Sequence, residues 1–542
     1  NRPAYDIALV AEGMQSTSPT LPEIAQILGL SREEIDTQWR RARARPFEPY
    51  VIASDVPWET VARVQSNRPR LPGVEVLVTP RRDYPQGSLF AHTLGYMAMI
   101  NERDLREGSP LVPYPAGAMV GRAGLERIWE DELRGIDGGA QVEVDALQRI
   151  LRELSRVEPQ PGHSLRVTLD LDLQRSAAEA MEGQRGAAVA IDPRNGEILA
   201  MVSAPSYDPG AFVRGLTPQE WAALVNDPGK PLDNKAIRGQ YPPGSVFKIV
   251  TALAGLREHV TDARRTVYCA GALHFADRRF GCWRRGGHGT VALHKALVSS
   301  CDVYFYTIGL EVGVNAIADV ARSLGLGQAT GIDLLGERSG LIPTREWKRG
   351  HLNEPWYDGE TLPVSIGQGF VLTTPLQLAL MTSAVANGGT VYSPHIVREV
   401  VDASGETIRR IVPKVVGRLE ASPGDLRLVQ DALKGVVNEV GGTGARARLP
   451  GIVVAGKTGT SQVISNRPRD ESDRVRPEKE EIPLNERDHA WFVAYAPVEN
   501  PEIAVAVLVE HGGGGGSVAA PIAQKILARH FGVDLTASAD AP

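Results

Sequence analysis

The sequence predicts an α+β protein of two domains: a mixed N-terminal domain, then a larger domain in which helices flank an antiparallel sheet. Three observations support this prediction. The chain has 542 residues, more than one ordinary domain contains. Residues 158–162 are rich in Pro and Gly and indicate a linker. Beyond this linker, strand-like apolar runs stand before and after a long helix-rich stretch. We therefore expect domains at residues 1–160 and 161–536, with a tail at 537–542.

Composition narrows the functional classes. Hydrophobic residues make up 42% of the chain, which is ordinary globular usage. The formal net charge of -6 gives no support for a nucleic-acid partner. We see no run of eighteen apolar residues and no signal peptide at the start. The chain opens on Asn1 and not on Met, so we expect that the true N-terminus has been removed.

The N-terminal domain is predicted to mix short strands and helices. Residues 4–11 alternate weakly, as a strand does. Capping boxes at 20–23 and 31–34 each predict a helix start. The second helix ends in a basic run, residues 40–45, which we interpret as a solvated face in preference to a contact with anionic lipid or polymer. A further helix is expected from about residue 121 to about 135.

The C-terminal domain is predicted to contain a hairpin, several helices and three later strands. The turn at 192–196 separates two apolar runs and predicts the hairpin. The charged, Pro-containing segment 465–487 predicts a mobile loop. The expected strands are residues 165–169, 187–191, 197–202, 452–455, 490–496 and 503–510, and the expected helices are 173–181, one from 245, 293–310 and 518–531.

The residues 241–250 form the stretch around which the chain is organised. Ser245 and Lys248 lie three apart behind Pro242, Pro243 and Gly244, at a predicted helix start. Residues three apart share one face of a helix, so the hydroxyl and the amine are within reach of each other. A serine becomes a nucleophile when a base stands beside it, and a lysine can act as that base when its amine is held neutral. Alone, however, Ser-x-x-Lys is a weak signal.

Two further motifs strengthen the case that Ser245 and Lys248 are catalytic. Ser300-Cys301-Asp302 lies in the second predicted helix, and Lys457-Thr458-Gly459-Thr460 follows the apolar run 452–455. The ordered set Ser-x-x-Lys, Ser-x-Asp, Lys-Thr-Gly resembles the motifs of penicillin-binding proteins and serine β-lactamases. Singly, Ser300 is more often a helix residue bonded to its own backbone, and Lys457 a solvated strand end. The two non-catalytic interpretations are each common, but all the motifs occurring together in this order by chance is improbable.

Acyl transfer to serine assigns a role to each residue. Ser245 is the expected nucleophile and Lys248 the base, and Ser300 relays a proton to the leaving nitrogen. Asp302 is expected to point elsewhere on its helix, to orient its neighbours and to help set the charge of the lysines. Lys457 offers a positive charge to a substrate carboxylate, and Thr458 and Thr460 offer hydroxyls. Gly459 is expected to let the substrate backbone lie close to the strand.

The segment 451–458 also matches the pattern of a phosphate-binding loop, Gly-x4-Gly-Lys-Thr. A true loop of this kind follows a strand and precedes a helix. Here the four inner positions are apolar residues that form the strand itself, and a charged, Pro-containing stretch follows. We therefore set nucleotide hydrolysis aside.

The resemblance extends over nearly the whole chain. Residues 186–209, 365–369, 441–445 and 491–497 add to the three motifs. Together they resemble class B penicillin-binding proteins, and Asp302 resembles their elongation-specific penicillin-binding protein 2 subgroup. The resemblance implies that residues 1–160 form a pedestal or dimerisation-type domain without a glycosyltransferase motif. It also implies an oxyanion hole formed by the N–H groups of Ser245 and Thr460.

The resemblance further implies a peptidoglycan D,D-transpeptidase that β-lactam antibiotics inhibit and that needs no cofactor for catalysis. Its expected donors are stem peptides ending in D-Ala-D-Ala, and its expected partner is a SEDS-family, RodA-like glycosyltransferase. The implied location is the outer face of the cell membrane, with a single-pass anchor missing from this chain. A D,D-carboxypeptidase or β-lactamase that hydrolyses the same acyl-enzyme is one alternative, although no Glu is placed as a deacylating base. A non-catalytic activator of the polymerase is the other.

All three cysteines of the chain lie close together in sequence with one histidine. Cys269, Cys282, His288 and Cys301 are the set, and three thiolates with one imidazole suit tetrahedral zinc. A structural zinc bound there would hold the second motif from behind. A disulfide between Cys269 and Cys282, with Cys301 free, is the rival interpretation, and three buried thiols are a third.

Overall fold

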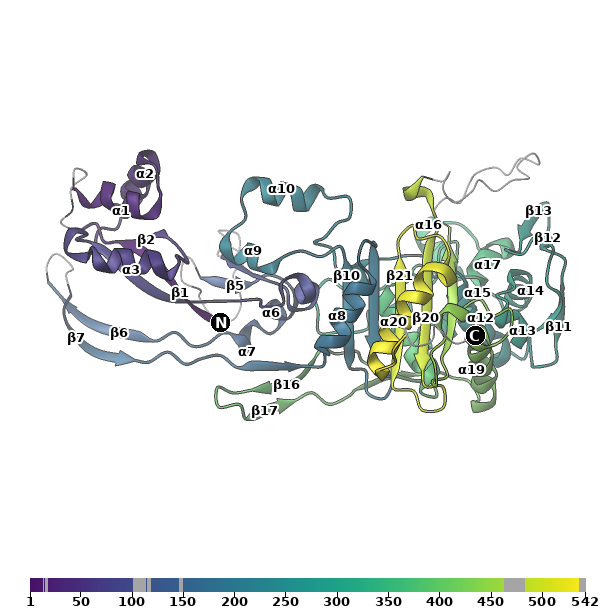
Figure 1. Ribbon diagram of the computed structural model, residues 1–542. Coiled ribbons are helices and arrows are strands. Elements are labelled where there is room, and N and C mark those ends of the chain that lie inside the picture. Colours follow the sequence, from purple (N-terminus) through teal and green to yellow (C-terminus); the bar gives the residue numbers. More distant parts are fainter. Residues whose placement is uncertain are drawn as a thin grey trace.

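A computed structural model describes residues 1–535, except residues 13, 15–17, 101–113, 115–117, 146–149 and 463–482. Figure 1 shows an elongated molecule in which the N-terminal domain lies at one end and the large sheet and helices at the other. The segment 465–487 falls mostly outside the described residues, and the tail 537–542 falls outside them entirely. In the described part, no helix is both long enough and apolar enough to cross a bilayer.

The N-terminal domain begins with a small antiparallel sheet covered by helices. Its strand order is β2-β1-β3, and a core that includes Ile7, Leu9 and Trp39 lies beneath the helices. Ser31 forms the predicted capping box with Glu34. The predicted box at Thr20 is wrong, because Pro19 occupies the cap position and makes no side-chain bond there. The elements are β1 Arg2–Leu9, α1 Thr20–Leu28, α2 Arg32–Ala42, β2 Tyr50–Ala53, α3 Trp58–Ser66, η1 Arg68–Arg70 and β3 Val74–Arg81.

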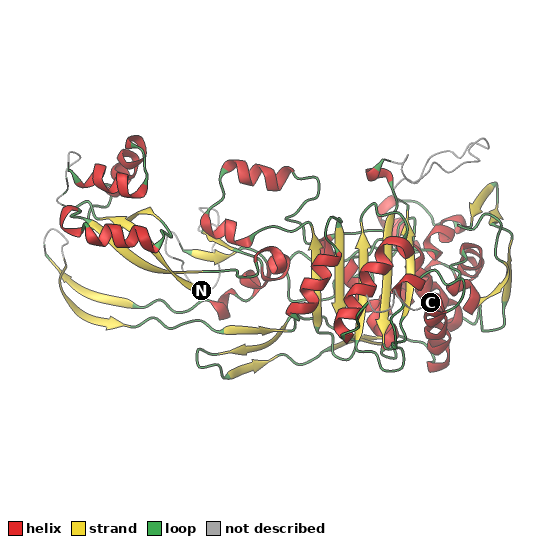
Figure 2. Cartoon of the chain, in the orientation of Figure 1, coloured by secondary structure: helices red, strands yellow, loops and turns green. Residues whose placement is uncertain are grey.

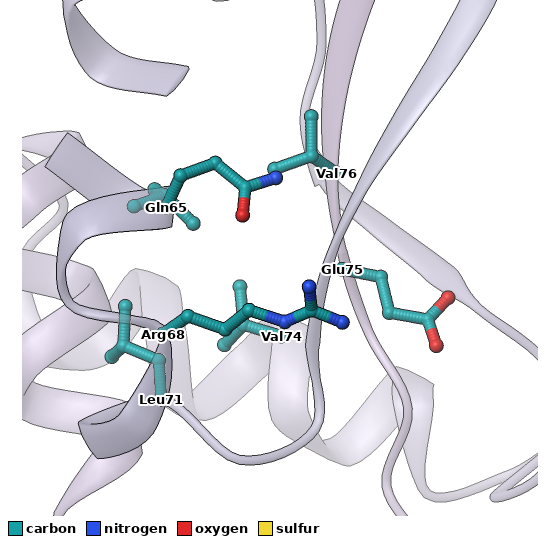
Figure 3. A pocket seen from close by; sticks show the side chains of 7 residues that line it. Gln65, Arg68, Leu71, Val74, Glu75 and Val76 are labelled. Carbon is teal, nitrogen blue, oxygen red and sulfur yellow. The ribbon is translucent and has the colours of Figure 1, made fainter. Parts of the chain in front are cut away.

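A cavity of about 230 Å³ lies in this first part of the chain, between α3–η1 and β3 (Figure 3). Gln65 and Arg68 form one wall, and Glu75 lies on the other. None of the residues that the sequence predicts for catalysis, substrate or metal lines this cavity.

The second part of the N-terminal domain connects it to the larger domain. The predicted helix after Gly121 is divided in two, with the break at Trp129. The Pro/Gly segment is ordered, since Gln160 and Ile136 bond to each other through their backbones. The elements are η2 Gly87–Phe90, α4 Ala91–Leu94, β4 Met97–Met99, β5 Met119–Gly121, α6 Gly124–Ile128, α7 Glu130–Leu133, and the long hairpin β6 Gly139–Val144 and β7 Ile150–Val157.

The C-terminal domain is built on a five-stranded antiparallel sheet with the order β10-β9-β21-β20-β19 (Figures 1 and 2). The predicted hairpin and the two late strands are confirmed. The strand predicted at 452–455 is displaced, since β19 begins at Ala455 and contains the Lys-Thr-Gly residues themselves. The strands are β9 Gly186–Ile191, β10 Ile198–Ala204, β19 Ala455–Ser461, β20 His489–Ala496 and β21 Ile503–Val509.

Helices cover both faces of this sheet. α8 Leu171–Ala180 and α20 Ala520–Phe531 pack together on one face, which is drawn in front in Figure 2. The opposite face packs on α18 Pro375–Ala386, whose twelve residues are all buried. The other helices are α9 Pro209–Arg214, α10 Pro218–Asn226, α11 Lys235–Arg238, α12 Lys248–Arg257, α13 Leu293–Val298, α14 Asp302–Val312, α15 Val314–Ser323, α16 Arg345–Leu352, α17 Asp358–Ser365 and α19 Pro423–Asn438.

Several short strands interrupt the stretch that we predicted as helix-rich. The predicted strand at 165–169 is β8, which pairs with β16 in a separate small sheet. The short strands are β8 Ser164–Val167, β11 Thr266–Cys269, β12 Ala272–Phe275, β13 Arg278–Gly281, β14 Gly289–Ala292, β15 Thr390–Tyr392, β16 Val397–Val401, β17 Thr407–Arg410 and β18 Val415–Arg418. Single helical turns are η3 Gly244–Phe247, η4 Ala445–Ala447 and η6 Leu484–Glu486, and η7 Gly515–Ala519 is a π turn that leads into α20.

Candidate active site

The fold brings the three sequence motifs together between the edge strand β19 and the helices beside it. Ser245 lies in the 3₁₀ turn η3, immediately before α12. Ser300 lies in the break between α13 and α14. Lys457 is a residue of β19. The three segments are far apart in the sequence, so only the tertiary structure makes them neighbours.

The turn that carries Ser245 is held against β19 at close range. Gly244 has φ +55, which favours glycine, and a Cβ built there would lie 2.6 Å from the carbonyl oxygen of Thr460. The Gly244 N–H donates to the carbonyl of Gly367 at 2.9 Å, and Trp491 Nε1 donates to the carbonyl of Pro242 at 3.0 Å. Ser245 is therefore presented from a fixed turn and remains partly exposed.

The second motif occupies a break between two helices, not the single helix predicted at 293–310. α13 ends at Val298 and α14 begins at Asp302. Ser300 has φ +54, a conformation that a non-glycine residue adopts at some cost. The break turns Ser300 toward the lysines. It also places the Asp302 carboxylate in the first turn of α14, where the helix dipole favours a negative charge.

Lys248 lies in the centre of a buried polar cluster. Its side chain is 0% exposed, and its Nζ donates to Asp302 Oδ1 at 2.6 Å, to the Ser300 carbonyl at 2.9 Å and to Ser300 Oγ at 3.2 Å. The prediction that Asp302 points elsewhere is wrong, because its carboxylate accepts a hydrogen bond from Lys248 Nζ at the start of α14. Among the hydrogen bonds of the described residues, Lys248 Nζ has no bond to Ser245 Oγ.

Lys457 completes the cluster from the opposite side. Its Nζ donates to Ser300 Oγ at 2.9 Å, so the Ser300 hydroxyl lies between two amines. Burial, followed by the charge of Lys248, lowers the pKa of Lys457 well below its ordinary value. Lys457 is completely buried, so its amine does not lie at the protein surface, and a substrate carboxylate would have to approach it within the site.

The two threonines of β19 lie two residues apart and therefore share one face of the strand. Thr458 and Thr460 alternate with Lys457 along the strand, and Thr460 is the exposed one. Gly459 also serves the packing of the protein itself, in addition to the role toward substrate that we predict for it. A Cβ there would lie 2.8 Å from the Pro243 carbonyl oxygen and 2.9 Å from Trp491 Cβ. Gly459 makes room for the turn that carries Ser245.

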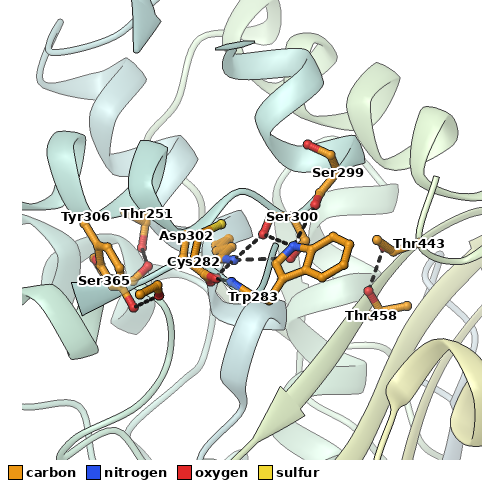
Figure 4. Close-up of polar contacts among 12 residues, drawn as sticks. Thr251, Cys282, Trp283, Ser299, Ser300, Asp302, Tyr306, Ser365, Thr443 and Thr458 are labelled. Atoms are coloured by element: carbon orange, nitrogen blue, oxygen red, sulfur yellow. Dashed lines mark hydrogen bonds and ion pairs between the residues drawn. The ribbon is translucent and has the colours of Figure 1, made fainter. Parts of the chain in front are cut away.

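Two residues of the site were not predicted. The Trp283 N–H donates to Asp302 Oδ2 at 2.8 Å, and its Nε1 donates to the carbonyls of Ser299 at 3.0 Å and Ser300 at 3.1 Å. Figure 4 shows the indole beside Ser300, and Thr443 bonded to Thr458 on the other side of the site. Trp283 immediately follows Cys282, and its spacing forms no motif. Thr443 lies in the segment 441–445, which contributes to the family resemblance but which carried no assigned role.

The four predicted metal ligands also come together, directly behind the second motif. One ligand atom from each of Cys269, Cys282, His288 and Cys301 lies within 4.8 Å of the others. His288 Nδ1 is 3.5 Å from Cys282 Sγ and 3.7 Å from Cys269 Sγ. Tetrahedral zinc with Zn–S of about 2.3 Å and Zn–N of about 2.0 Å requires a separation of about 3.6 Å. The donor set therefore fits zinc in its chemistry, and the two distances from His288 are close to this separation.

The cysteines are free thiols, so the structure contains no Cys269–Cys282 disulfide. The Cys301 thiol donates to the Cys282 sulfur, which lowers the pKa of Cys282 and raises that of Cys301. Cys282 therefore has the thiolate character that a metal ligand needs, whereas Cys301 would have to give up its proton when a metal binds.

Two family models match the two domains. Residues 186–528 match the penicillin binding protein transpeptidase domain, and residues 1–167 match the penicillin-binding protein dimerisation domain. The site thus defines a serine acyltransferase of the transpeptidase class, and the chain belongs to the penicillin-binding protein family.

The relatives agree with the penicillin-binding protein 2 resemblance. The chain is 36% identical to the peptidoglycan D,D-transpeptidase MrdA of Escherichia coli K12, over 96% of this chain and 82% of that protein. It is 37% identical to the MrdA of Acinetobacter baumannii, over 96% of this chain and 76% of that protein. The structure of Helicobacter pylori penicillin-binding protein 2 in complex with MreC superposes with a TM-score of 0.83 at 28% identity, over 98% of this chain and 94% of that one. The structure of Pseudomonas aeruginosa penicillin-binding protein 2 superposes with a TM-score of 0.69 at 35% identity, over 84% of this chain and 93% of that one. The predicted subgroup is confirmed.

Proposed function

We propose that this protein is a peptidoglycan D,D-transpeptidase that cross-links stem peptides during cell elongation through an acyl-Ser245 intermediate. The observation that carries the proposal is the position of the Ser300 hydroxyl between the amines of Lys248 and Lys457, at 3.2 and 2.9 Å. The relatives named peptidoglycan D,D-transpeptidase support the reaction and its substrate.

The charges of the cluster explain how a base becomes available. Two buried amines share one carboxylate, that of Asp302. Holding both amines protonated would leave a net positive charge away from water, which is costly. The lowered pKa of Lys457 agrees with one of the two amines being neutral. A proton can pass between them through Ser300 Oγ, so Lys248 can accept the proton of Ser245.

In the acylation step, Ser245 Oγ attacks the carbonyl carbon of the penultimate D-Ala, and its proton goes to Lys248 Nζ. The N–H groups of Ser245 and Thr460 would receive the oxyanion, and the close packing of Gly244 on Thr460 supports this pairing. The C–N bond then breaks, and the leaving D-Ala nitrogen takes a proton through Ser300 Oγ. An amine of a second stem peptide attacks the ester, releases Ser245 and forms the cross-link.

The edge position of β19 suits an extended peptide donor. β19 pairs with β20 on one side only within the five-stranded sheet. A donor peptide can therefore lie beside it as an added strand, with its terminal carboxylate at the hydroxyls of Thr458 and Thr460. β-Lactams carry a carboxylate beside the reactive amide and would bind in the same way.

Acylation by labelled penicillin tests the proposal directly. We expect covalent labelling of the wild type, none of Ser245→Ala, and unchanged labelling of Ser323→Ala. Ser323 is the matched control because its hydroxyl bonds to Val320, within its own helix. Labelling of Ser245→Ala would refute the assignment of the nucleophile. With a peptide donor and an amine acceptor, predominant transfer to water would favour the hydrolase alternative.

We also propose that Cys269, Cys282, His288 and Cys301 hold a structural zinc ion. Zinc would tie the hairpins around Cys269 and Cys282 to the break that carries Ser300, without entering the reaction. Metal analysis of protein purified without chelator should find about one zinc per chain. Absence of zinc, together with a thiol titration that shows a disulfide, would favour the rival interpretation.

For partners and location, we propose a SEDS-family, RodA-like glycosyltransferase contacted through the N-terminal domain, and a membrane anchor ahead of this chain with the catalytic domain in the periplasm. A structure titled as a peptidoglycan synthase complex that coordinates polymerization and crosslinking supports this, with a TM-score of 0.75 at 31% identity over 98% of this chain and 88% of that one. A photo-crosslinking residue at the exposed Val78 should capture the polymerase in membranes, whereas one at the exposed Val440 should not. Equal capture at both positions would contradict it.

A further inference from the structure

Thr443 reaches the substrate strand from a different part of the chain. It lies in the turn after α19, and its Oγ1 is 2.8 Å from Thr458 Oγ1 (Figure 4). Thr458 is one of the hydroxyls expected to receive the substrate carboxylate. Thr443 is half-buried, and it belongs to none of the three motifs.

Three glycines hold Thr443 in this place. A Cβ at Gly442 would lie 2.4 Å from the Val436 carbonyl oxygen, and one at Gly444 would lie 3.0 Å from the Phe492 ring. A Cβ at Gly516 would lie 2.4 Å from the carbonyl oxygen of Thr443 itself. The turn thus packs against α19, β20 and η7 at distances that leave no room for side chains. Its position is fixed before substrate arrives.

The direction of the hydrogen bond decides what Thr458 can do. Each hydroxyl has a single proton to donate. A carboxylate only accepts hydrogen bonds, so Thr458 must donate to it. When Thr458 donates to the carboxylate, Thr443 must be the donor in the bond between the two threonines. A hydroxyl that receives a bond is also a better donor, because successive hydrogen bonds polarise one another.

We propose that Thr443 is a positioning residue for the substrate carboxylate: its hydroxyl donates to Thr458 Oγ1 and turns the Thr458 proton toward the substrate. This inference rests on the proposed function and adds a residue to its carboxylate site. It predicts that Thr443 matters for ligands with a free carboxylate and not for the same ligands without one.

The test compares benzylpenicillin with its methyl ester, which lacks the carboxylate charge, in wild-type protein and in Thr443→Val and Thr443→Ser. We expect the second-order acylation rate with benzylpenicillin to fall about five- to tenfold in Thr443→Val, the size of one lost hydrogen bond. The rate with the ester should stay within about twofold of the wild-type rate. Thr443→Ser should restore the benzylpenicillin rate, since it retains the hydroxyl. Thr307→Val is the control, because the Thr307 hydroxyl bonds to the Val303 carbonyl of its own helix.

An unchanged benzylpenicillin rate in Thr443→Val would overturn the inference. An equal loss with both ligands, or no recovery in Thr443→Ser, would show a structural role and would also overturn it. If Thr443→Val does not fold, Thr443→Ala takes its place in the same comparison. Failure of the wild type to be acylated at all is a different result, and it would overturn the proposed function together with this inference.

Discussion

Lys457 Nζ lies 2.9 Å from Ser300 Oγ, although 157 residues separate them in the chain. This contact joins the edge strand of the large sheet to the break between two helices. The pKa of the Lys457 amine is lowered, and the Ser300 hydroxyl that it contacts is also bonded to Lys248 Nζ. Several consequences can be measured.

The lowered pKa of Lys457 should appear in the pH dependence of stability. Between its lowered folded pKa and the ordinary value of 10.5, the unfolded chain binds a proton that the folded chain does not. The free energy of unfolding should therefore rise with pH in this window, with a slope of at most about 1.4 kcal/mol per pH unit from this group. Urea unfolding of Lys457→Met should lack this contribution. Lys434→Met, at a half-exposed position, should keep the wild-type slope, and identical slopes for Lys457→Met and wild type would contradict the prediction.

His92 should make the protein less stable in mild acid. Burial lowers its pKa from 6.5 to about 4, and its Nε2 bonds to the Pro231 carbonyl across the two domains at 2.7 Å. The folded state keeps His92 neutral, so its contribution to stability is complete above about pH 6.5 and is lost as pH falls toward 4. Each unit by which the pH falls in this range lowers the free energy of unfolding by about 1.4 kcal/mol, so the total loss is about 3 kcal/mol.

Urea unfolding at pH 7.5 and pH 5 measures this loss. His92→Gln can keep a donor near Pro231 without titrating, so it should lose less stability between the two pH values than the wild type. The exposed His274→Gln serves as the control. Equal losses in His92→Gln and wild type would rule out His92 as the source.

Gly459→Ala should weaken both the fold and acylation. The new methyl would meet the Pro243 carbonyl and Trp491 Cβ, so the turn that carries Ser245 must move away from β19. We expect the free energy of unfolding to fall by about 1–3 kcal/mol, and penicillin acylation to slow with it. Gly350→Ala has open space around its Cβ on α16, and should raise stability slightly by helix propensity. A fully active and stable Gly459→Ala would mean that the turn has more freedom than the contacts indicate.

Trp283→Phe should slow acylation without unfolding the protein. The phenyl ring fills much of the indole space but cannot donate to the carbonyls of Ser299 and Ser300. Because the Ser300 backbone is held less firmly, we expect the acylation rate to fall about three- to tenfold, with a small change in Tm. Trp221→Phe, on the exposed helix α10, is the matched control and should behave as wild type. If Trp221→Phe and Trp283→Phe gave the same rates, the indole bonds would be irrelevant to acylation.

Local patterns explain why the sequence predicted so many of the elements. The turn at 192–196 and the alternation on each side of it define the β9–β10 hairpin, and the two late apolar runs define β20 and β21. The order of the three motifs identified Ser245, Ser300 and Lys457. Each of these signals lies within a few residues of chain, where backbone preference and side-chain pattern act together.

The tertiary structure decided the rest, because long-range contacts override local preference. The helix predicted at 293–310 breaks so that Ser300 can face two amines, and the break points Asp302 at Lys248. Gly459 serves the Ser245 turn, and Thr443 reaches Thr458 from another segment. The sequence by itself determined which groups carry the chemistry. Only the folded chain decided which groups can share a proton. Proton sharing depends on distances between residues that are 54 and 157 positions apart in the sequence, and on the exclusion of water around them.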